Sequence, residues 1–441
     1  MAKYKEYNQH QIMLLPPSLE EKIEEKHIAR YISRAVDALD IKEIDQEFSE
    51  IGCRAYHPKM LLKILLYGYS AGIRSSRRIQ RESREDLVFM WLAGMQEPDF
   101  RTISDFRKGK IKNIKNLFLQ VLETCVELGM VKCGKICIDG TKIEANSSRY
   151  KMEYRKSLEK RKKTYEAEID KIFDEADRVD AEEDRLYGNH DGYSLERVFT
   201  PEEIAKAVKK VQRRQQQLEK AKEKTVLKLQ VSNEKLERMG NNRNSYSNTD
   251  KDATLMLMKE GCLRPGYNVQ LATENQVIVG YGISERPNDN RLLPSMVKEV
   301  ENNLPESPEV IIADKGYASQ NNYEYLEERG LKGAIPHQYY DYDRAARKKG
   351  IYKLSSNLVY EKLKLKMMDY LETEEGQALM DRRKHDVEPT IGDIKHNMGF
   401  RRFLLRLRPR VNIEFGLIAI AHNIKKIKSW TEVRELSPVP A

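Results

Sequence analysis

The sequence lacks the features that define several large classes of protein. No apolar run approaches the length of about 18 residues that a membrane-spanning helix needs, and the first residues show no signal-peptide core. No P-loop or dinucleotide-binding glycine pattern precedes a predicted helix, and no Ser-His-Asp set is recognisable. We therefore expect no membrane partner, and neither ATP nor NAD chemistry has support.

Cysteine is scarce, and its spacing is uninformative. None of the cysteines forms a Cys-x-x-Cys pair, which predicts reduced structural thiols in a cytosolic protein. With no apolar span or signal-peptide core, we expect a cytoplasmic, bacterial protein. The five are Cys53, Cys125, Cys133, Cys137 and Cys262.

Charge, in contrast, is abundant and unbalanced. The 441 residues include 78 Lys and Arg against 69 Asp and Glu, which gives a net charge of +9 and a pI of about 9.0. A hydrophobic fraction of 40% is enough for a packed core, whereas 33% charged residues and a mean hydropathy of −0.70 predict long solvated surfaces. The length predicts two or three domains, and the basic balance makes nucleic acid the leading partner.

Three acidic residues in separate segments carry most of the functional information. Asp139 and Asp314 each end a short apolar run beside a glycine, as when a buried strand delivers a carboxylate at its C-terminal end. Glu388 precedes Pro389, which predicts a helix start with proline at the first position. Three such carboxylates can hold two divalent cations for in-line displacement at a phosphodiester. Taken singly, each could instead form a turn or cap a helix.

The sequence around Glu388 is strongly basic. Its arginines and lysines alternate with phenylalanine and leucine, a pattern that would hold a polyanion such as DNA. A solvated basic helix face is the alternative. The basic residues are Arg382, Arg383, Lys384, Lys395, Arg401, Arg402, Arg406, Arg408 and Arg410.

Residues 1–130 are predicted to be helical. Pro58 opens an apolar helix, and Arg74, Arg77, Arg78 and Arg81 follow at a spacing that would form one basic stripe. Short helices with such a stripe suit a helix-turn-helix-like DNA-binding domain, although a helical bundle with arginines in water fits the same pattern.

Residues 149–250 have the spacing of two long helices. Apolar residues recur every three or four positions on both sides of a loop signal at 187–193, and Thr200 to Glu203 form a capping box. We expect an antiparallel, coiled-coil-like helical hairpin. Its basic run at 155–163 could contact DNA or could be a solvated face.

The segment after 250 alternates like a sheet. It predicts a strand hairpin over 266–284, a helix over 292–303, the Asp314 strand, a helix over 321–329 and a strand over 333–336. A mixed sheet flanked by helices follows, in which Asp139 and Asp314 meet at neighbouring strand ends.

Seven short segments, in order, resemble insertion-sequence transposases of the DDE class, near the family numbered eleven-eighty-two and the wider IS-four-like group. The segments span about positions 56 to 425. They are Tyr56–Lys63, Gly68–Arg78, Pro98–Arg107, Asp139–Lys142, Ala313–Tyr317, Val387–Pro389 and Gly399–Phe403.

The resemblance implies an α/β fold with a ribonuclease-H-like catalytic core at 131–430, interrupted by the helical insertion at 149–250. An N-terminal all-α domain at 1–130 and a tail at 431–441 complete the expected organisation. Asp139, Asp314 and Glu388 are implied as metal-binding catalysts with Mg²⁺, for which Mn²⁺ would substitute.

The expected partners are terminal inverted repeats and target DNA, bound by a homodimer or higher oligomer at the nucleoid. The basic residues expected at DNA are Arg74, Arg77, Arg78, Arg81, Arg383, Lys384, Lys395, Arg401 and Arg402. A non-catalytic DNA-binding descendant of a transposase, or a metal-dependent nuclease without strand transfer, remains an alternative.

One departure concerns the Tyr, Arg, Glu and Lys that the wider group carries around the glutamate. Lys395 stands at the expected place, seven residues after Glu388. The arginine position holds Lys384, with Arg383 adjacent, and the tyrosine position holds Asp381.

Overall fold

The computed structural model describes residues 18–46, 55–111, 113–187, 200–241 and 243–436. The chain forms two compact units, one of Met1–Asn146 with Met256–Ala441 and the other of Ser147–Leu255. Within the described ranges, no helix is both long and apolar enough to cross a membrane. Cys53 and the predicted loop at 188–193 lie outside these ranges.

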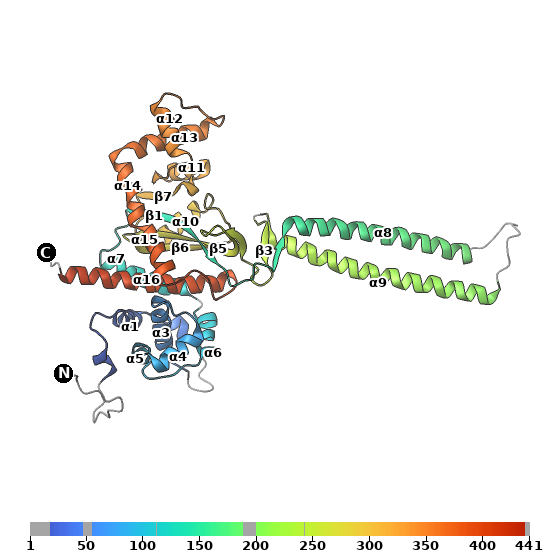
Figure 1. Ribbon diagram of the computed structural model, residues 1–441, viewed down its shortest axis with the longest axis horizontal. Helices are drawn as coiled ribbons and strands as arrows, with labels where there is room; N and C mark the ends of the chain where they lie inside the picture. Colours follow the sequence, from blue (N-terminus) through green and yellow to red (C-terminus); the bar gives the residue numbers. More distant parts are fainter. Residues whose placement is uncertain (1–17, 47–54, 112, 188–199, 242, 437–441) are drawn as a thin grey trace, which may run out of the picture. The chain divides into compact units, whose positions relative to one another are not determined.

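The described part of 1–130 is helical, as predicted (Figure 1). Pro58 does open a helix, and the His57 ring accepts a hydrogen bond from the Lys59 amide at its start. The helices are η1 (Leu19–Lys22), α1 (Ile28–Ala38), α2 (Lys42–Asp45), α3 (Pro58–Ser70), α4 (Ser76–Glu85), α5 (Leu87–Leu92), α6 (Phe100–Asp105), η2 (Phe106–Lys110) and α7 (Ile114–Glu127).

The rest of the first unit is built on a mixed sheet. Strand β5 pairs antiparallel with β1 and β6, whereas β7 pairs parallel with β1 and with β8. The strands are β1 (Lys135–Glu144), β4 (Thr254–Leu257), β5 (Leu263–Glu274), β6 (Val277–Ser284), β7 (Val310–Ala313) and β8 (Lys332–Ala334). The accompanying helices are α10 (Leu293–Asn303), η3 (Lys315–Tyr317), α11 (Gln320–Glu328), α12 (Tyr340–Lys348), α13 (Leu358–Glu372), α14 (Glu374–His385), α15 (Val387–Gly392), η4 (Asp393–Asn397) and α16 (Arg408–Leu436).

The predicted order of hairpin, helix, strand, helix and strand is confirmed within a few residues, but β1 is longer than predicted. Its apolar run stops at Asp139, yet the strand continues to Glu144. The reason is its second partner: β7 pairs only with the first half of β1, and β5 follows it from Cys137 to Glu144.

A buried glutamate fixes the chain where it enters β1. Glu274, at the end of β5, accepts hydrogen bonds from the backbone amides of Lys132 and Cys133, at 2.9 Å each. Its second oxygen accepts from the amides of Gly134 and Lys135. Because the Glu274 side chain is only 2% exposed, these four donors replace the water that the carboxylate loses on burial.

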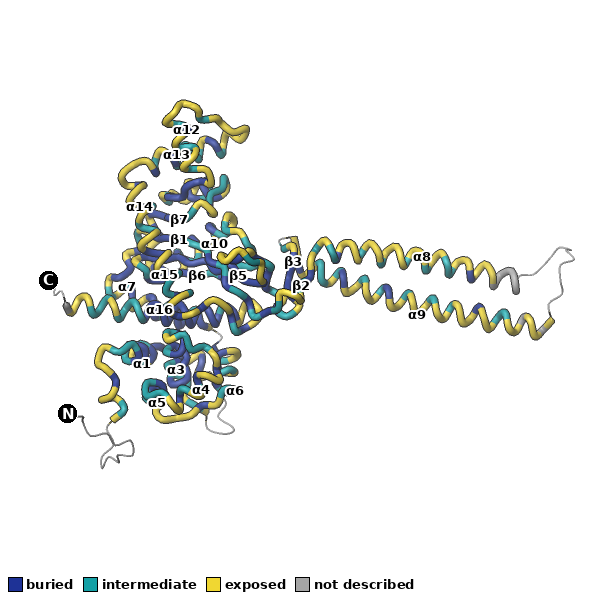
Figure 2. The backbone as a smooth tube through the Cα atoms, in the orientation of Figure 1, coloured by how far each residue is buried: buried dark blue, intermediate teal, exposed yellow. Residues whose placement is uncertain are grey.

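Helix α16 covers the outer strand β6 and also packs on the N-terminal helices α1, α3 and α7. The Asn423 side chain accepts from the Ile278 amide and donates to the Ile278 carbonyl, at 2.9 Å each, so it continues the strand pairing. The middle turns of α16 are buried, and its C-terminal turns are more exposed (Figure 2). The helix runs to Leu436, so residues 431–436 of the predicted tail are helical.

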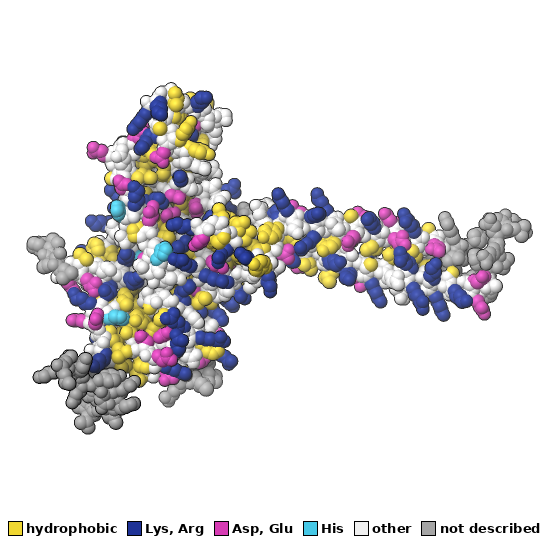
Figure 3. Space-filling model, viewed as in Figure 1, with side chains coloured by type: hydrophobic (Ala, Val, Ile, Leu, Met, Phe, Trp, Pro, Cys, Tyr) yellow, Lys and Arg dark blue, Asp and Glu magenta, His cyan; other side chains and the backbone are white. Residues whose placement is uncertain are grey.

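The second unit contains the predicted antiparallel hairpin, formed by α8 (Arg155–Tyr187) and α9 (Pro201–Met239) (Figure 1). The capping box at Thr200 and Glu203 is present. A ribbon of β2 (Met152–Tyr154) and β3 (Ser245–Ser247), not predicted, closes the base of the hairpin. Lysine and arginine side chains project along both helices (Figure 3).

Replacing Glu274 by Gln should lower the unfolding free energy of the first unit by about 3 kcal/mol, because the amide has one acceptor oxygen and turns a donor toward backbone amides. The chain has two tryptophans, Trp91 and Trp430, and both belong to the first unit. Urea unfolding followed by tryptophan fluorescence therefore reports on this unit. The exposed Glu123, replaced by Gln, is the matched control, and an equal midpoint for both variants would contradict the role of Glu274.

Candidate active site

Strand pairing brings two of the three predicted carboxylates together. Ile138 of β1 pairs with Ala313 of β7 in the last parallel register pair. Asp139 and Asp314 are the residues that follow this pair on their two strands. Asp314 also begins the short helix η3, where its side chain accepts from the Gly316 amide at 2.9 Å.

The two aspartates stand in a desolvated, mutually repulsive setting. Burial, followed by repulsion from Asp314, raises the pKa of Asp139 to about 7. Burial also raises the pKa of Asp314. Two partly buried, neighbouring carboxylates are a local excess of negative charge that a cation would relieve.

Glu388 lies in the first turn of α15, on the helix side of the site. The helix begins at Val387, so Pro389 is its third residue, and the predicted proline at the first position is wrong. The preceding Asp386 fixes this corner, because its two oxygens accept from the backbone amides of Asn275 and Gln276 at 2.8 Å each. These amides belong to the β5–β6 turn, where both residues have positive φ.

Arg383 connects the helix-borne glutamate to the sheet. One guanidinium nitrogen lies 3.3 Å from Asp139 Oδ2, and the other lies 2.9 Å from Glu388 Oε1. The Arg383 and Asp139 side chains are 21% and 16% exposed, whereas Glu388 is 46% exposed, so water screens the Glu388 half of the bridge more. The structure thus joins Asp139 and Glu388 through a guanidinium.

The other two basic residues near Glu388 lie differently. The Lys384 ammonium pairs with Asp381 at 2.8 Å, and both side chains are more than 60% exposed. Lys395, in the π-helical turn η4, donates to the Lys142 carbonyl of β1 at 3.1 Å, and burial lowers its pKa. Of the adjacent pair, Arg383 forms ion pairs with Asp139 and Glu388, whereas Lys384 pairs with Asp381.

The donor set suits a hard divalent cation such as Mg²⁺ or Mn²⁺, since carboxylate oxygens are the ligands that these ions prefer. Burial and the neighbouring Asp314 raise the pKa of Asp139 although Arg383 acts to lower it. Within the described ranges, no three acidic, histidine or cysteine side chains are already set to hold an ion together. Asp139, Asp314 and Glu388 could hold one only if Arg383 released the carboxylates.

The predicted arginine stripe is only partly on one helix. Arg74 precedes α4, and its guanidinium donates to the carbonyls of Arg402 and Gly399 while stacking over Phe400. The prediction that it continues the stripe is therefore wrong. Arg77, Arg78 and Arg81 do lie on α4 and are exposed.

Arg401 and Arg402 lie beside the end of β1. The Arg401 carbonyl accepts from the Glu144 amide at 3.1 Å, and the Arg402 guanidinium lies 3.6 Å from the Glu144 carboxylate. Both arginine side chains are exposed.

Sequence reasoning missed the polar residues behind the aspartates. Asn268 and Gln270 of β5, Asp289 in the loop before α10 and Tyr317 of η3 form one hydrogen-bonded group. The alternation of Asn268 and Gln270 with apolar neighbours is a signal for a polar strand face, but it gives no sign that this face is buried.

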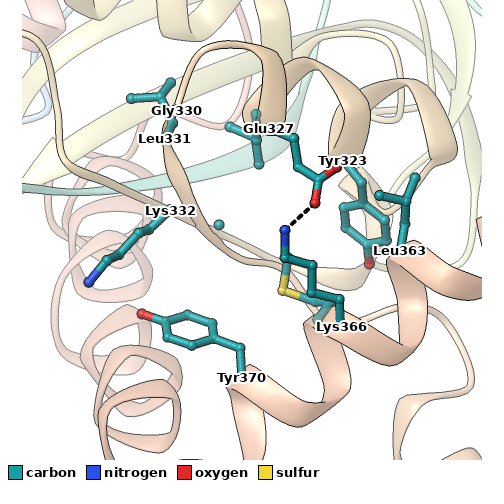
Figure 4. Close-up of a pocket in the computed structure, with 11 residues that line it drawn as sticks. Tyr323, Glu327, Gly330, Leu331, Lys332, Leu363, Lys366 and Tyr370 are labelled. Carbon is teal, nitrogen blue, oxygen red and sulfur yellow. Dashed lines mark hydrogen bonds and ion pairs between the residues drawn. The ribbon is translucent and has the colours of Figure 1, made fainter.

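A cavity of about 390 Å³ lies between α11, β8 and α13 and is lined by other residues than those of the candidate site (Figure 4). Its walls are largely apolar, and Glu327 pairs with Lys366 at its rim. None of the three predicted carboxylates lines it, so it is not part of the candidate site.

The fold and the site define a class of α/β proteins in which a mixed sheet presents paired carboxylates surrounded by basic residues. Comparison with protein families makes the class specific. Residues 17–109 match the family described as Transposase domain (DUF772), and residues 243–424 match the family described as Transposase DDE domain. Together these matches support an insertion-sequence DDE transposase. No curated protein and no solved structure matches the chain.

The two matched ranges contain only part of the candidate site. Asp314 and Glu388 fall within the range matched to the Transposase DDE domain, whereas Asp139 lies between the two ranges. The parallel pairing of β1 with β7 is what connects Asp139 to the matched part.

Replacing Arg383 by Gln should strengthen Mn²⁺ binding severalfold in the absence of DNA, because a cation that competes for Asp139 and Glu388 is removed. Titration of the full chain, followed by the electron paramagnetic resonance signal of free Mn²⁺, would measure the affinity. The Lys384→Gln variant loses the same charge one residue away and should bind like the wild type. Weaker binding by the Arg383 variant would show instead that the guanidinium organises the ligands.

Proposed function

We propose that this protein is a DNA transposase that performs metal-dependent strand cleavage and strand transfer with Asp139, Asp314 and Glu388. The observation that carries the proposal is the register of β1 and β7, which sets Asp139 beside Asp314. The Arg383 bridge, which draws Glu388 to the same place, supports it.

The strand order also supports a ribonuclease-H-like core. Five strands follow across the sheet in the order β6, β5, β1, β7 and β8, and β4 also pairs with β5. The pairs β6–β5 and β5–β1 are antiparallel, and the pairs β1–β7 and β7–β8 are parallel. The two aspartates lie where the parallel half ends on the two central strands, β1 and β7. Side chains at this edge of parallel strands commonly form the site in such sheets.

Each residue has a role that its setting suits. Bound divalent cations would supply positive charge to the attacking and leaving oxygens. Asp139 and Asp314 stand on adjacent strands, so their separation is set by the sheet and not by flexible loops. Glu388 is held by the helix corner that Asp386 fixes. Once released from the carboxylates, the Arg383 guanidinium can donate to a phosphate oxygen.

The reaction proceeds in two displacements at phosphorus. Water attacks the phosphodiester at the element's end and releases a 3′-hydroxyl. That hydroxyl then attacks a phosphodiester of the target DNA, whose own 3′-oxygen leaves. No covalent protein intermediate is needed, because the carboxylates supply charge and geometry only.

The variants Asp139→Asn, Asp314→Asn and Glu388→Gln should each reduce cleavage of a DNA end by at least about a hundredfold while the protein stays folded and DNA-bound. Each change removes one charge and almost preserves shape. Gel assays with labelled element ends, with and without Mg²⁺, would measure cleavage and joining. Asp341→Asn on the exposed face of α12 is the control. Near-wild-type cleavage by any triad variant would remove that residue from the proposal.

The same assay separates the alternative functions. Cleavage without joining would favour a nuclease, and binding without either step would favour a DNA-binding protein.

The arginines on α4 should contribute to DNA affinity through phosphates. Replacing Arg77, Arg78 and Arg81 by Ala in the full chain should flatten the plot of log affinity against log salt by up to about three units, since each phosphate contact contributes roughly 0.9. The matched control is Arg74→Ala, because that side chain is bound to carbonyls within the protein. It should lower stability and leave the slope unchanged. An unchanged slope in the triple variant would assign the α4 arginines to solvent.

A further inference from the structure

A fourth carboxylate stands beside the two aspartates, in the loop between β6 and α10. The carbonyl of Asp289 accepts from the Leu292 amide at 2.8 Å, which turns the chain into α10. Its side chain is directed back toward the ends of β1 and β7, where it approaches Gly140 and Gly316. It therefore reaches the same place as Asp139 and Asp314.

Buried amides hold one oxygen of this carboxylate. Asp289 Oδ1 accepts from Asn268 Nδ2 and from Gln270 Nε2, at 2.7 Å each. Gln270 in turn accepts from the Tyr317 hydroxyl. Asn268, Gln270 and Tyr317 are at most 2% exposed, so the group is rigid and its donors are committed to Oδ1.

Two glycines leave the room that Asp289 occupies. A Cβ atom on Gly140 would lie 2.4 Å from Asp289 Oδ1, closer than non-bonded atoms can approach. A Cβ atom on Gly316 would lie 3.6 Å from Asp289 Oδ2 and 2.9 Å from Asp314 Oδ1. The second oxygen of Asp289 and the carboxylate of Asp314 thus flank one small space.

The charge of Asp289 is not neutralised by an ion pair of its own. Arg383 contacts Asp139 and Glu388, and no lysine or arginine of the described ranges forms a salt bridge with Asp289. Repulsion from Asp289 adds to the raised pKa of both Asp139 and Asp314. The two amides that contact Asp289 are neutral, so they hold the carboxylate in place without supplying a positive charge.

We propose that Asp289 is a fourth carboxylate of the metal centre and that its Oδ2 would contribute to holding a divalent cation together with Asp139 and Asp314. The inference rests on the proposed function and adds a ligand to it. The amide group behind Asp289 would orient this oxygen, as hydrogen-bonded partners commonly orient metal ligands.

The test is the Mn²⁺ affinity of the full-length protein without DNA, from the paramagnetic resonance signal of the free ion. Asp289→Asn can keep the hydrogen bonds to Oδ1 and loses only the charge, so it should weaken binding by about tenfold or more. Asp289→Glu, which restores a carboxylate, should recover part of that loss. The exposed Asp341→Asn is the control and should bind like the wild type.

A second variant keeps the inference testable if the asparagine protein is unstable. Gly140→Ala leaves every charge in place. Its methyl group would clash with Asp289 Oδ1 and with Gln270 Nε2, which holds that oxygen, so the displaced carboxylate should also bind Mn²⁺ more weakly. Urea unfolding with tryptophan fluorescence would show that each variant is folded under the assay conditions.

The outcomes separate this inference from the function on which it rests. If Asp139→Asn and Asp314→Asn weaken Mn²⁺ binding while the folded Asp289→Asn and Gly140→Ala variants bind like the wild type, Asp289 is not a ligand and the proposed function stands. If none of these variants changes Mn²⁺ binding, the metal centre is wrong and both proposals fail.

Discussion

The parallel pairing of β1 with β7 is the constraint on which the rest of the site depends. Ile136 to Ile138 and Ile311 to Ala313 are fully buried, so the register cannot slip without exposing a block of the core. Because the register is fixed, Asp139 and Asp314 are held together in spite of their repulsion. Arg383 offsets part of this repulsion by bridging Asp139 and Glu388. Asp289, which buried amides hold nearby, adds to it.

The sequence was sufficient where periodicity and local chemistry agree. In each segment concerned, the spacing of its own apolar residues indicates the element that forms. This holds for the β5–β6 hairpin, for the helices after it and for the long antiparallel helices of the second unit. The extent of β1 was not predictable in this way, because residues 140–144 are strand through their pairing with β5. The buried Asn268 and Gln270 were not predicted because polar residues that alternate along a strand usually face solvent. Asp289 was not predicted because an aspartate in a loop usually forms a turn.

The arginine position expected four residues before Glu388 holds Lys384, yet Arg383 contacts the carboxylates. This difference has a geometric cause. Counting back from Glu388 along an ideal helix assumes that the helix is continuous, whereas α14 ends at His385 and α15 starts at Val387. Asp386, with φ −115° and ψ −79°, separates them. A break of this kind rotates the residues before it relative to those after it. The arginine five positions before the glutamate therefore faces the carboxylates, and the lysine four positions before it does not.

The clamp between Asp386 and the turn at Asn275 and Gln276 also has a consequence for the order in which the protein matures. The turn is synthesised more than a hundred residues before the aspartate that binds it, and Asn423, which completes the edge of β6, comes later still. On the ribosome, the nascent chain therefore carries both central aspartates before it can seat the glutamate. Of the three proposed catalytic carboxylates, Glu388 is thus the last to be synthesised and the last to be fixed in place.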